Sequence, residues 1–299
     1  MSFEIARTVE QAVAAIAGGA VPVAGGSDLV VSSRHTGAPL PAAMVGIDRI
    51  PELQVVEATE AGIRIGATVT HASLMNDPTV VDGYTALADA AALVGSPATR
   101  NVGTIGGNVM NASPAMDTGA PLVVMGAQVE LRSAAGVRQL PIGALWTAPR
   151  STTARPDELC TAVLLPSPGD RCGSAYVRLE YRLAMEIAVV GAAAAAVLDD
   201  VGAVARARIA LTAVAPTIVE VDAAGALTSG RVVDEELCAA VAAAAAERAE
   251  PIADLRAGAE YRRHTVGVMA SRAFDAAARR AGGEHIGVPV NRSTGIGAP

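Results

Sequence analysis

Hydrophobic residues recur along this chain in short runs separated by glycine, proline and polar turns. Near the N-terminus, Thr8 and Gln11 have the spacing of a capping box, and the apolar positions after them recur at helical spacing. We expect a short buried strand over 21–24, a turn over 29–33 and a second strand over 43–47. This order of helix, strand, loop and strand is typical of a small α/β unit.

The middle of the chain alternates strand patterns with helical patterns. The expected elements are paired strands over 53–58 and 62–67, a short helix after Thr70, a helix over 80–94, a hairpin over 128–132 and 137–140, and a strand over 159–165. Gly95-Ser96-Pro97 ends the helix, because glycine and proline interrupt helical structure. His71 falls in the short helix, where capping or packing is the more common role for such a residue.

A proline-rich segment, Pro166–Asp170, suggests a domain boundary. The pattern beyond it predicts three strands, over 175–181, 187–198 and 206–214, and two helices, over 234–248 and 259–281. The alanine-rich middle strand would also suit a helix by propensity alone. The last residues, from Gly282 onward, are rich in glycine and proline, and we expect them to be mobile unless a partner holds them.

One stretch, Val102–Asp117, shows neither helical nor strand periodicity and is rich in Gly, Asn, Thr and Ser. Glycine lets a ligand lie against bare backbone, and short polar side chains add hydrogen-bond donors. Such a segment is typical of a cradle for a phosphate-bearing ligand. A second glycine pair, Gly25-Gly26, follows a short apolar run and precedes Ser27-Asp28. Two such loops could hold one long anion from two sides, although each pair alone could be only a tight turn.

Composition narrows the classes of function. The formal net charge of −7 and a total of one Trp, four Tyr and two Phe argue against a nucleic-acid-binding surface. The chain contains no lysine, which excludes a lysine-bearing P-loop and a lysine Schiff base. The alanine-rich run over 189–198 is too short to span a bilayer, and we expect no transmembrane segment.

The cysteines and histidines show no metal-ligand spacing. Cys160, Cys172 and Cys238 are far apart, and the four histidines are scattered. We therefore expect neither an iron–sulfur nor a zinc site in this chain. Three thiols without a disulfide framework, together with an N-terminus that lacks a signal segment, suggest a cytoplasmic protein.

Several motifs together resemble one family. Ala24–Leu29 matches its first loop, Thr104–Asn108 matches its second, and Asp117 follows at the family's spacing after Ala112-Ser113-Pro114. Further on, Ala175–Leu179 and 187–190 resemble the start of its C-terminal domain. On these motifs, the chain resembles the FAD-binding medium subunits of molybdenum hydroxylases, a group that includes carbon monoxide dehydrogenase medium subunits and xanthine dehydrogenase flavin domains. The similarity runs over about residues 1–281.

The resemblance implies an α+β fold. An FAD-binding domain of the vanillyl-alcohol-oxidase type would cover 1–167, with two α/β subdomains over about 1–52 and 53–167. A smaller α+β domain of three strands and helices, like the C-terminal domain of carbon monoxide dehydrogenase flavoproteins, would cover 168–282. Residues 283–299 would form a flexible tail.

The resemblance also implies the residues that bind FAD between the two subdomains. Backbone N–H groups of Gly25, Gly26, Gly106 and Gly107 would bind the diphosphate, and Asp117 would bind a ribose or ribityl hydroxyl. The implied cofactor-binding residues are Val21, Pro22, Val23, Ala24, Gly25, Gly26, Ser27, Asp28, Val102, Gly103, Thr104, Ile105, Gly106, Gly107, Asn108, Met110, Asn111, Met116, Asp117, Cys160 and Arg178.

Some of these positions depart from the family pattern. Arg178 stands where relatives often carry a lysine near the flavin, and a surface ion pair with Glu180 is the alternative role for it. Cys160 stands where relatives place an apolar residue against the ring system, and Met116 replaces a small polar residue found in some relatives.

The implied activity is electron transfer without a catalytic residue, because the flavin carries the chemistry. Electrons would come from a large molybdopterin-cofactor subunit through a small subunit with two-iron two-sulfur clusters, in an (αβγ)2 assembly. Two alternatives are a self-sufficient FAD-dependent reductase of the same flavin fold and a non-catalytic assembly subunit. The substrate and the electron acceptor stay open.

Overall fold

The first part of the chain forms a small parallel sheet covered by one helix. In the computed structural model, which describes residues 1–37, 39–182 and 184–293, this sheet has the strand order β1-β3-β2. Its elements are β1 (Ser2–Ile5), α1 (Val9–Ala17), β2 (Val21–Val23), α2 (Ser27–Thr36) and β3 (Ala43–Gly46). The predicted capping box is confirmed, since the Thr8 side chain accepts a hydrogen bond from the Gln11 N–H at 3.3 Å.

Two expectations for this part were wrong, and one strand was not predicted. The predicted strand over 21–24 is β2, but it is largely exposed rather than buried. The predicted turn over 29–33 is the middle of α2, and β1 was not predicted at all. β1 and α2 carry little alternation or amphipathic pattern, because most of their residues are exposed or half-buried.

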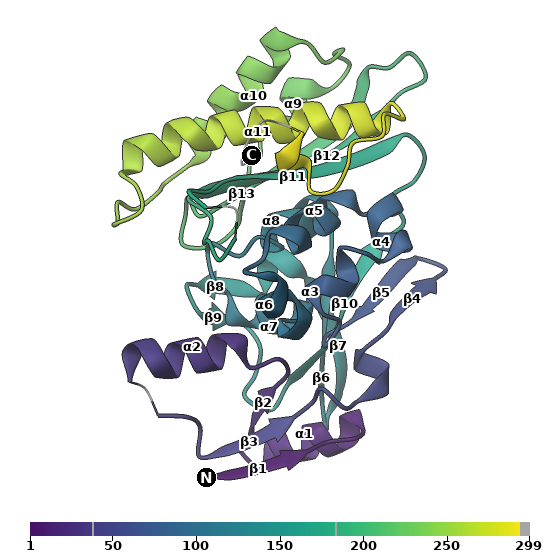
Figure 1. The fold of residues 1–299 in the computed structure, drawn as a ribbon. Helices are drawn as coiled ribbons and strands as arrows, with labels where there is room; N and C mark the ends of the chain where they lie inside the picture. Colours follow the sequence, from purple (N-terminus) through teal and green to yellow (C-terminus); the bar gives the residue numbers. More distant parts are fainter. Residues whose placement is uncertain (38, 183, 294–299) are drawn as a thin grey trace.

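The middle part is an antiparallel sheet of order β4-β5-β10-β6-β7 with helices on one side (Figure 1). Its strands are β4 (Val56–Thr59), β5 (Gly62–Gly66), β6 (Gln128–Ser133), β7 (Gly136–Pro141) and β10 (Leu159–Pro166), and a 3-10 turn η1 (Pro51–Leu53) precedes them. Between β7 and β10 lie a 3-10 turn η2 (Ile142–Ala144) and a small hairpin of β8 (Trp146–Ala148) and β9 (Ser151–Thr152). The predicted strand pairs are confirmed.

The helices of this part are short. They are α3 (His71–Leu74), α4 (Pro78–Gly83), α5 (Thr85–Leu93), α6 (Pro97–Val102), α7 (Ile105–Asn111) and α8 (Gly119–Val124). The single helix predicted over 80–94 is wrong, because Tyr84 leaves the helical conformation between α4 and α5. Its side chain is buried and its hydroxyl donates a hydrogen bond to the Pro166 carbonyl at 3.1 Å.

Part of the glycine-rich stretch, Ile105–Asn111, forms the helix α7, whereas no helix was expected there. The Thr104 side chain caps α7 by accepting the Gly107 N–H at 3.1 Å. A Cβ on Gly106 would lie 2.6 Å from the Cβ of Ala67, so glycine allows α7 to approach the end of β5 closely. Glycine lowers helix propensity, and here this close packing outweighs it.

The C-terminal domain is an antiparallel sheet, β11-β12-β13-β14, covered on its outer face by helices (Figure 1). Its elements are β11 (Cys172–Leu179), β12 (Val190–Leu198), β13 (Val204–Thr212), β14 (Val219–Glu220), α9 (Ala224–Thr228), α10 (Glu235–Arg248) and α11 (Ala259–Ala281). The predicted three strands and two long helices are confirmed.

The alanine-rich β12 is a strand because it is enclosed on both faces. Ala192, Ala194 and Ala196 belong to the core under the domain's own helices, whereas Ala193 belongs to the core shared with the middle part. Alternation with period two is the mark of a strand, and small side chains let both layers pack closely.

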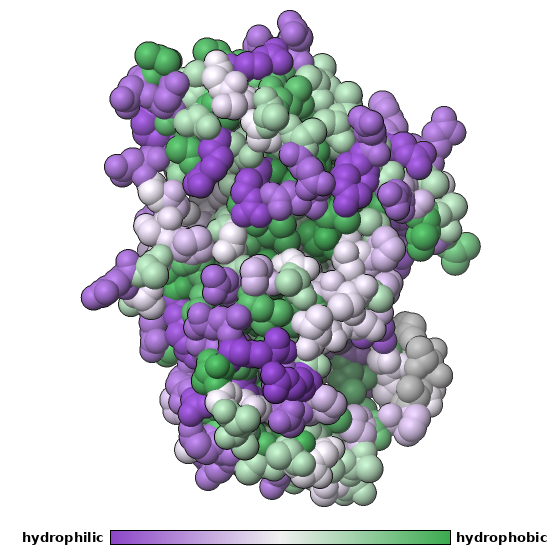
Figure 2. Space-filling view, turned by 180° about the vertical axis from the view of Figure 1, so that it is seen from behind, coloured by the Kyte–Doolittle hydropathy of each residue, from purple (hydrophilic) through white to green (hydrophobic). Residues whose placement is uncertain are grey.

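The face of the molecule opposite to that in Figure 1 mixes polar and apolar side chains (Figure 2). Over the described residues, no helix combines the length and apolarity needed to cross a membrane.

The described part of the tail packs against the rest of the chain, although its composition suggested mobility. A 3-10 turn, η3 (Val290–Arg292), lies beside β11. The Val290 N–H donates to Asp89 at 2.9 Å, and Asp89 also pairs with Arg280 at 2.6 Å. The fully buried Asp89 therefore links α5, α11 and the tail. The remaining tail, 294–299, lies outside the described residues.

Candidate cofactor site

A cleft of about 580 Å³ opens between the β2–α2 segment and the α6–α7 segment. Both glycine-rich stretches line it, as the sequence predicted. The predicted residues along the cleft are Val21, Pro22, Val23, Ala24, Gly25, Gly26, Ser27, Asp28, Gly103, Thr104, Gly107, Asn108, Met110 and Asn111. Two segments separated by about seventy-five residues thus form the two walls of one hollow.

The two walls touch at Gly25. A Cβ on Gly25 would overlap the Val102 carbonyl oxygen, so any larger residue forces the walls apart. Val102 itself lines a neighbouring hollow of about 490 Å³ on the far side of this contact, together with Thr70 and Asn101. The close approach requires glycine at position 25 and explains that part of the motif.

The backbone donors on the cleft belong to the first wall. The N-cap of α2 is Gly26, which has a left-handed φ of 68° and no side chain to cap the first-turn N–H groups. The N-terminus of this ten-residue helix lines the cleft at Ser27 and Asp28. Free N–H groups at a helix N-terminus suit an anion such as a phosphate.

The second wall differs from the prediction. The Gly106 N–H donates to the Ala67 carbonyl at 2.9 Å, and the Gly107 N–H donates to Thr104. These two N–H groups are therefore satisfied within the chain, and their role as phosphate donors stays a prediction. Gly107 lines the cleft without a side chain, while Gly106 is buried beneath it.

At one end of the cleft, side chains of the two walls meet. The Asn111 amide donates to the Asp28 carboxylate at 3.1 Å. Arg150, from the turn between β8 and β9, also lines this end. Burial raises the pKa of the Asp28 carboxyl, and the nearby Arg150 charge opposes that shift. Arg150 was not predicted from the sequence, because a lone arginine in a polar connector carries no motif.

The other end of the cleft is lined by Val94, Thr99 and His71. The His71 side chain is only 1% exposed, and its Nδ1 has no hydrogen-bond partner within the described structure. Burial, followed by the charge of Arg100, lowers the pKa of His71 to about 4. His71 is therefore neutral at pH 7. The expected helix cap is supplied by Thr70, which accepts the Ser73 N–H at 3.1 Å.

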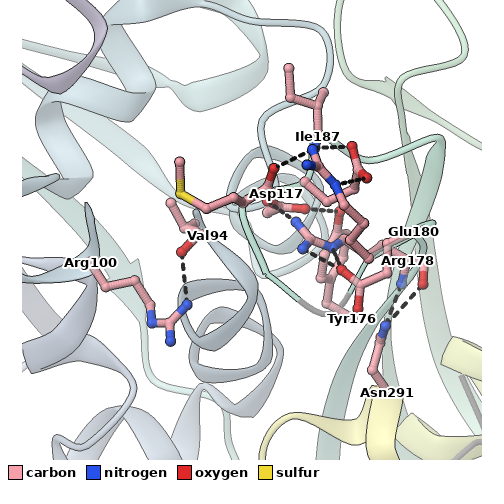
Figure 3. A network of polar contacts seen from close by, with 11 residues as sticks. Val94, Arg100, Asp117, Tyr176, Arg178, Glu180, Ile187 and Asn291 are labelled. Carbon is pink, nitrogen blue, oxygen red and sulfur yellow. Dashed lines mark hydrogen bonds and ion pairs between the residues drawn. The ribbon is translucent and has the colours of Figure 1, made fainter. Parts of the chain in front are cut away.

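Asp117 and Arg178 are not among the residues that line the cleft, and they belong to a buried polar network (Figure 3). The Asp117 carboxylate accepts from Arg178 at 2.7 Å and from the Tyr176 hydroxyl at 2.9 Å. Arg178 also pairs with Glu180, and its side chain is fully buried. Burial alone would lower the pKa of the Arg178 guanidinium, but the Asp117 and Glu180 carboxylates raise it above its ordinary value.

Two predictions change as a result. The ion pair of Arg178 with Glu180 exists, but it is buried rather than on the surface. Both Asp117 oxygens already accept a hydrogen bond within the chain, and the predicted binding of a ribose or ribityl hydroxyl by Asp117 stays a prediction. The Asn291 side chain completes the network by bonding the backbone N–H and carbonyl of Arg178 (Figure 3).

The remaining predicted residues, Ile105, Met116 and Cys160, belong to the hydrophobic core. Burial raises the pKa of the Cys160 thiol to about 12, so this thiol stays protonated and unreactive. Direct contact of these three residues with a cofactor stays a prediction. Among the residues that the structure describes, no cluster of three or more His, Cys, Asp or Glu is arranged to hold a metal ion.

The arrangement suits a long, phosphate-bearing ligand. The cleft combines a glycine contact between its walls, an uncapped helix N-terminus and the positive charge of Arg150. The donors are neutral N–H groups and one cation, which match a phosphate or diphosphate group. This is the kind of site that holds a dinucleotide.

Comparison with known proteins shows the family to which this chain belongs. Residues 1–168 match the model of the FAD binding domain in molybdopterin dehydrogenase, and 174–277 match that of the CO dehydrogenase flavoprotein C-terminal domain. The chain therefore belongs to the family of FAD-binding subunits of molybdenum hydroxylases, and it is a component of an oxidoreductase with FAD as its cofactor.

Individual relatives are similar over most of their length. A putative xanthine dehydrogenase FAD-binding subunit of Escherichia coli (strain K12) is 30% identical over 88% of this chain and 90% of its own. The carbon monoxide dehydrogenase medium chain of Hydrogenophaga pseudoflava is 32% identical over 79% and 82%. A solved structure of that organism's carbon monoxide dehydrogenase, lacking the Mo-pyranopterin moiety of the molybdenum cofactor, has a TM-score of 0.88 at 31% identity and covers 94% of this chain and 98% of the other. These comparisons confirm the predicted family, fold class and cofactor.

Proposed function

We propose that this chain is the electron-transfer subunit of a multi-subunit molybdenum hydroxylase. The observation that carries the proposal is the cleft, where the uncapped N-terminus of α2 faces the glycine-rich wall of α6 and α7. Bound FAD supplies the capacity to accept and release electrons, and the protein supplies position and electrostatics.

The residues of the cleft have distinct roles in this proposal. The backbone from Gly25 to Asp28 binds the diphosphate through its N–H groups. Thr104 and Asn108 fix the second wall, since Thr104 caps α7 and Asn108 accepts the Thr118 hydroxyl at 2.6 Å. Arg150 adds a positive charge at one end. No residue of this chain acts as a catalytic acid or base.

The partners that we propose are a large subunit with the molybdopterin cofactor and a small subunit with two-iron two-sulfur clusters, in an (αβγ)2 assembly. The similarity to a chain named as the medium chain of carbon monoxide dehydrogenase supports a divided complex. We place this assembly in the cytoplasm, in keeping with three free thiols that form no disulfide. Its substrate could be carbon monoxide, a purine, another N-heterocycle or an aldehyde.

The test is to purify the complex through a tag on this chain and to measure its FAD, molybdenum and iron. We expect one FAD per copy of this chain, and molybdenum and iron only when the partners co-purify. Removal of FAD should abolish reduction of a dye acceptor by those four substrate classes, while the metal content stays unchanged. A complex that still reduces the dye at the original rate without FAD would refute the electron-transfer role.

The two alternatives give different results in the same experiment. A self-sufficient reductase would turn over with NAD(P)H and a soluble substrate in the absence of any partner. An assembly subunit would join the complex but carry no flavin absorbance. Either result would replace the proposed function.

A further inference from the structure

We propose that α2 folds together with dinucleotide binding, so that the ligand of the cleft supplies the packing and the N-terminal cap that this helix lacks. The inference rests on the proposed function and deepens it, because it concerns how one wall of the same cleft is formed. The evidence is the contrast between α2 and the preceding helix α1, which has nearly the same length.

α2 is hardly buried within this chain. None of its residues over 27–34 is buried, and the Val30 side chain is 46% exposed. Over the described residues, no other helix or strand packs closely on α2, which projects from the left side of the molecule in Figure 1. α1, in contrast, buries four of its nine residues, from Val9 to Ile16. Burial therefore stabilises α1 but contributes little to α2.

The sequence of α2 does not favour an isolated helix either. Three serines and two valines stand among its ten residues, and both residue types have a lower helix propensity than alanine or leucine. The N-cap Gly26 has no side chain that could accept a first-turn N–H, whereas Thr8 caps α1. The left-handed Gly37 ends α2 favourably, but a helix of this length is marginal in water even when its sequence is favourable.

A ligand in the cleft supplies both missing contributions. The residues of α2 that line the cleft are Ser27, Asp28, Leu29, Val31 and Ser32. A phosphate that accepts the first-turn N–H groups acts as the missing N-cap, and the helix dipole favours its negative charge. A dinucleotide that fills the cleft also removes apolar surface of Leu29 and Val31 from water.

The helical conformation in the structure is the one that binds the ligand, because it places these residues on the cleft. A hydrogen bond from the Asn111 amide to Asp28, at 3.1 Å, joins α2 to the opposite wall, but it is exposed and water competes with it. In the FAD-free chain, folded α2 therefore exchanges with unfolded conformations. The apparent dissociation constant of FAD is then the intrinsic constant divided by the folded fraction of α2.

The first test changes helix propensity at Val30, which is exposed and does not line the cleft. In the full-length chain, Val30→Ala should bind FAD about threefold more tightly than wild type, and Val30→Gly about twofold more weakly, because alanine raises helix propensity and glycine lowers it. The matched control is Ala14→Gly, at an exposed position of α1. It should lower the urea concentration at which the chain unfolds and leave FAD affinity unchanged, because α1 is folded before FAD binds.

The second test is backbone hydrogen exchange of the full-length chain with and without FAD. The amides of residues 30–34 should exchange about tenfold more slowly once FAD is bound, whereas those of α1 should be protected in both states. Amides of α2 that are protected as strongly as those of α1 without FAD, or unchanged affinity in both Val30 variants, would overturn the inference while FAD still binds. A wild-type chain that binds no FAD would instead refute the proposed function.

Discussion

Asp117→Asn separates a structural role of this residue from a ligand-binding role. Asp117 and Arg178 are 8% and 0% exposed, and their charged atoms lie 2.7 Å apart. Removing one member of a buried ion pair costs about 3–5 kcal/mol, because the other charge is left uncompensated. Glu180 still pairs with Arg178, and asparagine still accepts the Tyr176 hydroxyl. We therefore expect a destabilisation near the lower limit, about 3 kcal/mol.

The assay is urea unfolding of the FAD-free, full-length chain at pH 7, followed by circular dichroism and by Trp146 fluorescence. Asp28→Asn is the matched control, since Asp28 lines the cleft and asparagine can keep the contact with Asn111. This control should unfold within about 0.5 kcal/mol of wild type, as for a substitution that leaves its contacts in place. An Asp117→Asn chain with wild-type stability that fails to bind FAD would show that Asp117 is a ligand and that the network is incidental.

Three further predictions concern the cleft and the domain junction. Gly25→Ala should weaken FAD binding at least tenfold and destabilise the FAD-free chain by about 1–3 kcal/mol, because the added Cβ overlaps a carbonyl of the opposite wall. The control Gly143→Ala has open space around its Cβ, and it should leave both FAD titration and urea unfolding unchanged. The pKa of His71 is about 4 in the folded chain and near 6.5 in the unfolded chain. The free energy of unfolding should therefore fall as the pH drops below 6.5 and level off below about pH 4, by about 3 kcal/mol in total. His71→Asn should flatten this pH dependence, and an equal slope in the variant would contradict the assignment to His71. Arg280→Met leaves the fully buried Asp89 without its ion-pair partner, so urea unfolding should show a loss of stability of about 3–5 kcal/mol. Limited proteolysis of this variant should release the C-terminal domain. Resistance equal to that of wild type would show that the domain junction does not depend on this ion pair.

Motifs with a local physical cause were predictable from the sequence. The capping box at Thr8, the hairpin turn before β7 and the long helix α11 each follow from residues close together in the chain. The two glycine-rich stretches were also identified as the walls of one site, because glycine at positions of close backbone approach leaves a clear signal.

Features that depend on distant packing were not predictable. The helical form of α7 depends on the contact of Gly106 with Ala67, which overrides a poor propensity. The burial of Arg178 depends on its ion pair with Asp117, which lies 61 residues away in the sequence. Arg150 reaches the cleft only because a hairpin folds back onto α7. In each case the decisive neighbour lies far away in the sequence or carries no motif.

A structure of the complex purified with its FAD tests the central claim most directly. We predict that the dinucleotide occupies the cleft, with its diphosphate at the backbone of Gly25–Asp28 and the Asp117–Arg178 pair intact. A diphosphate bound on any other surface, or an empty cleft in a complex that contains FAD, would contradict the account.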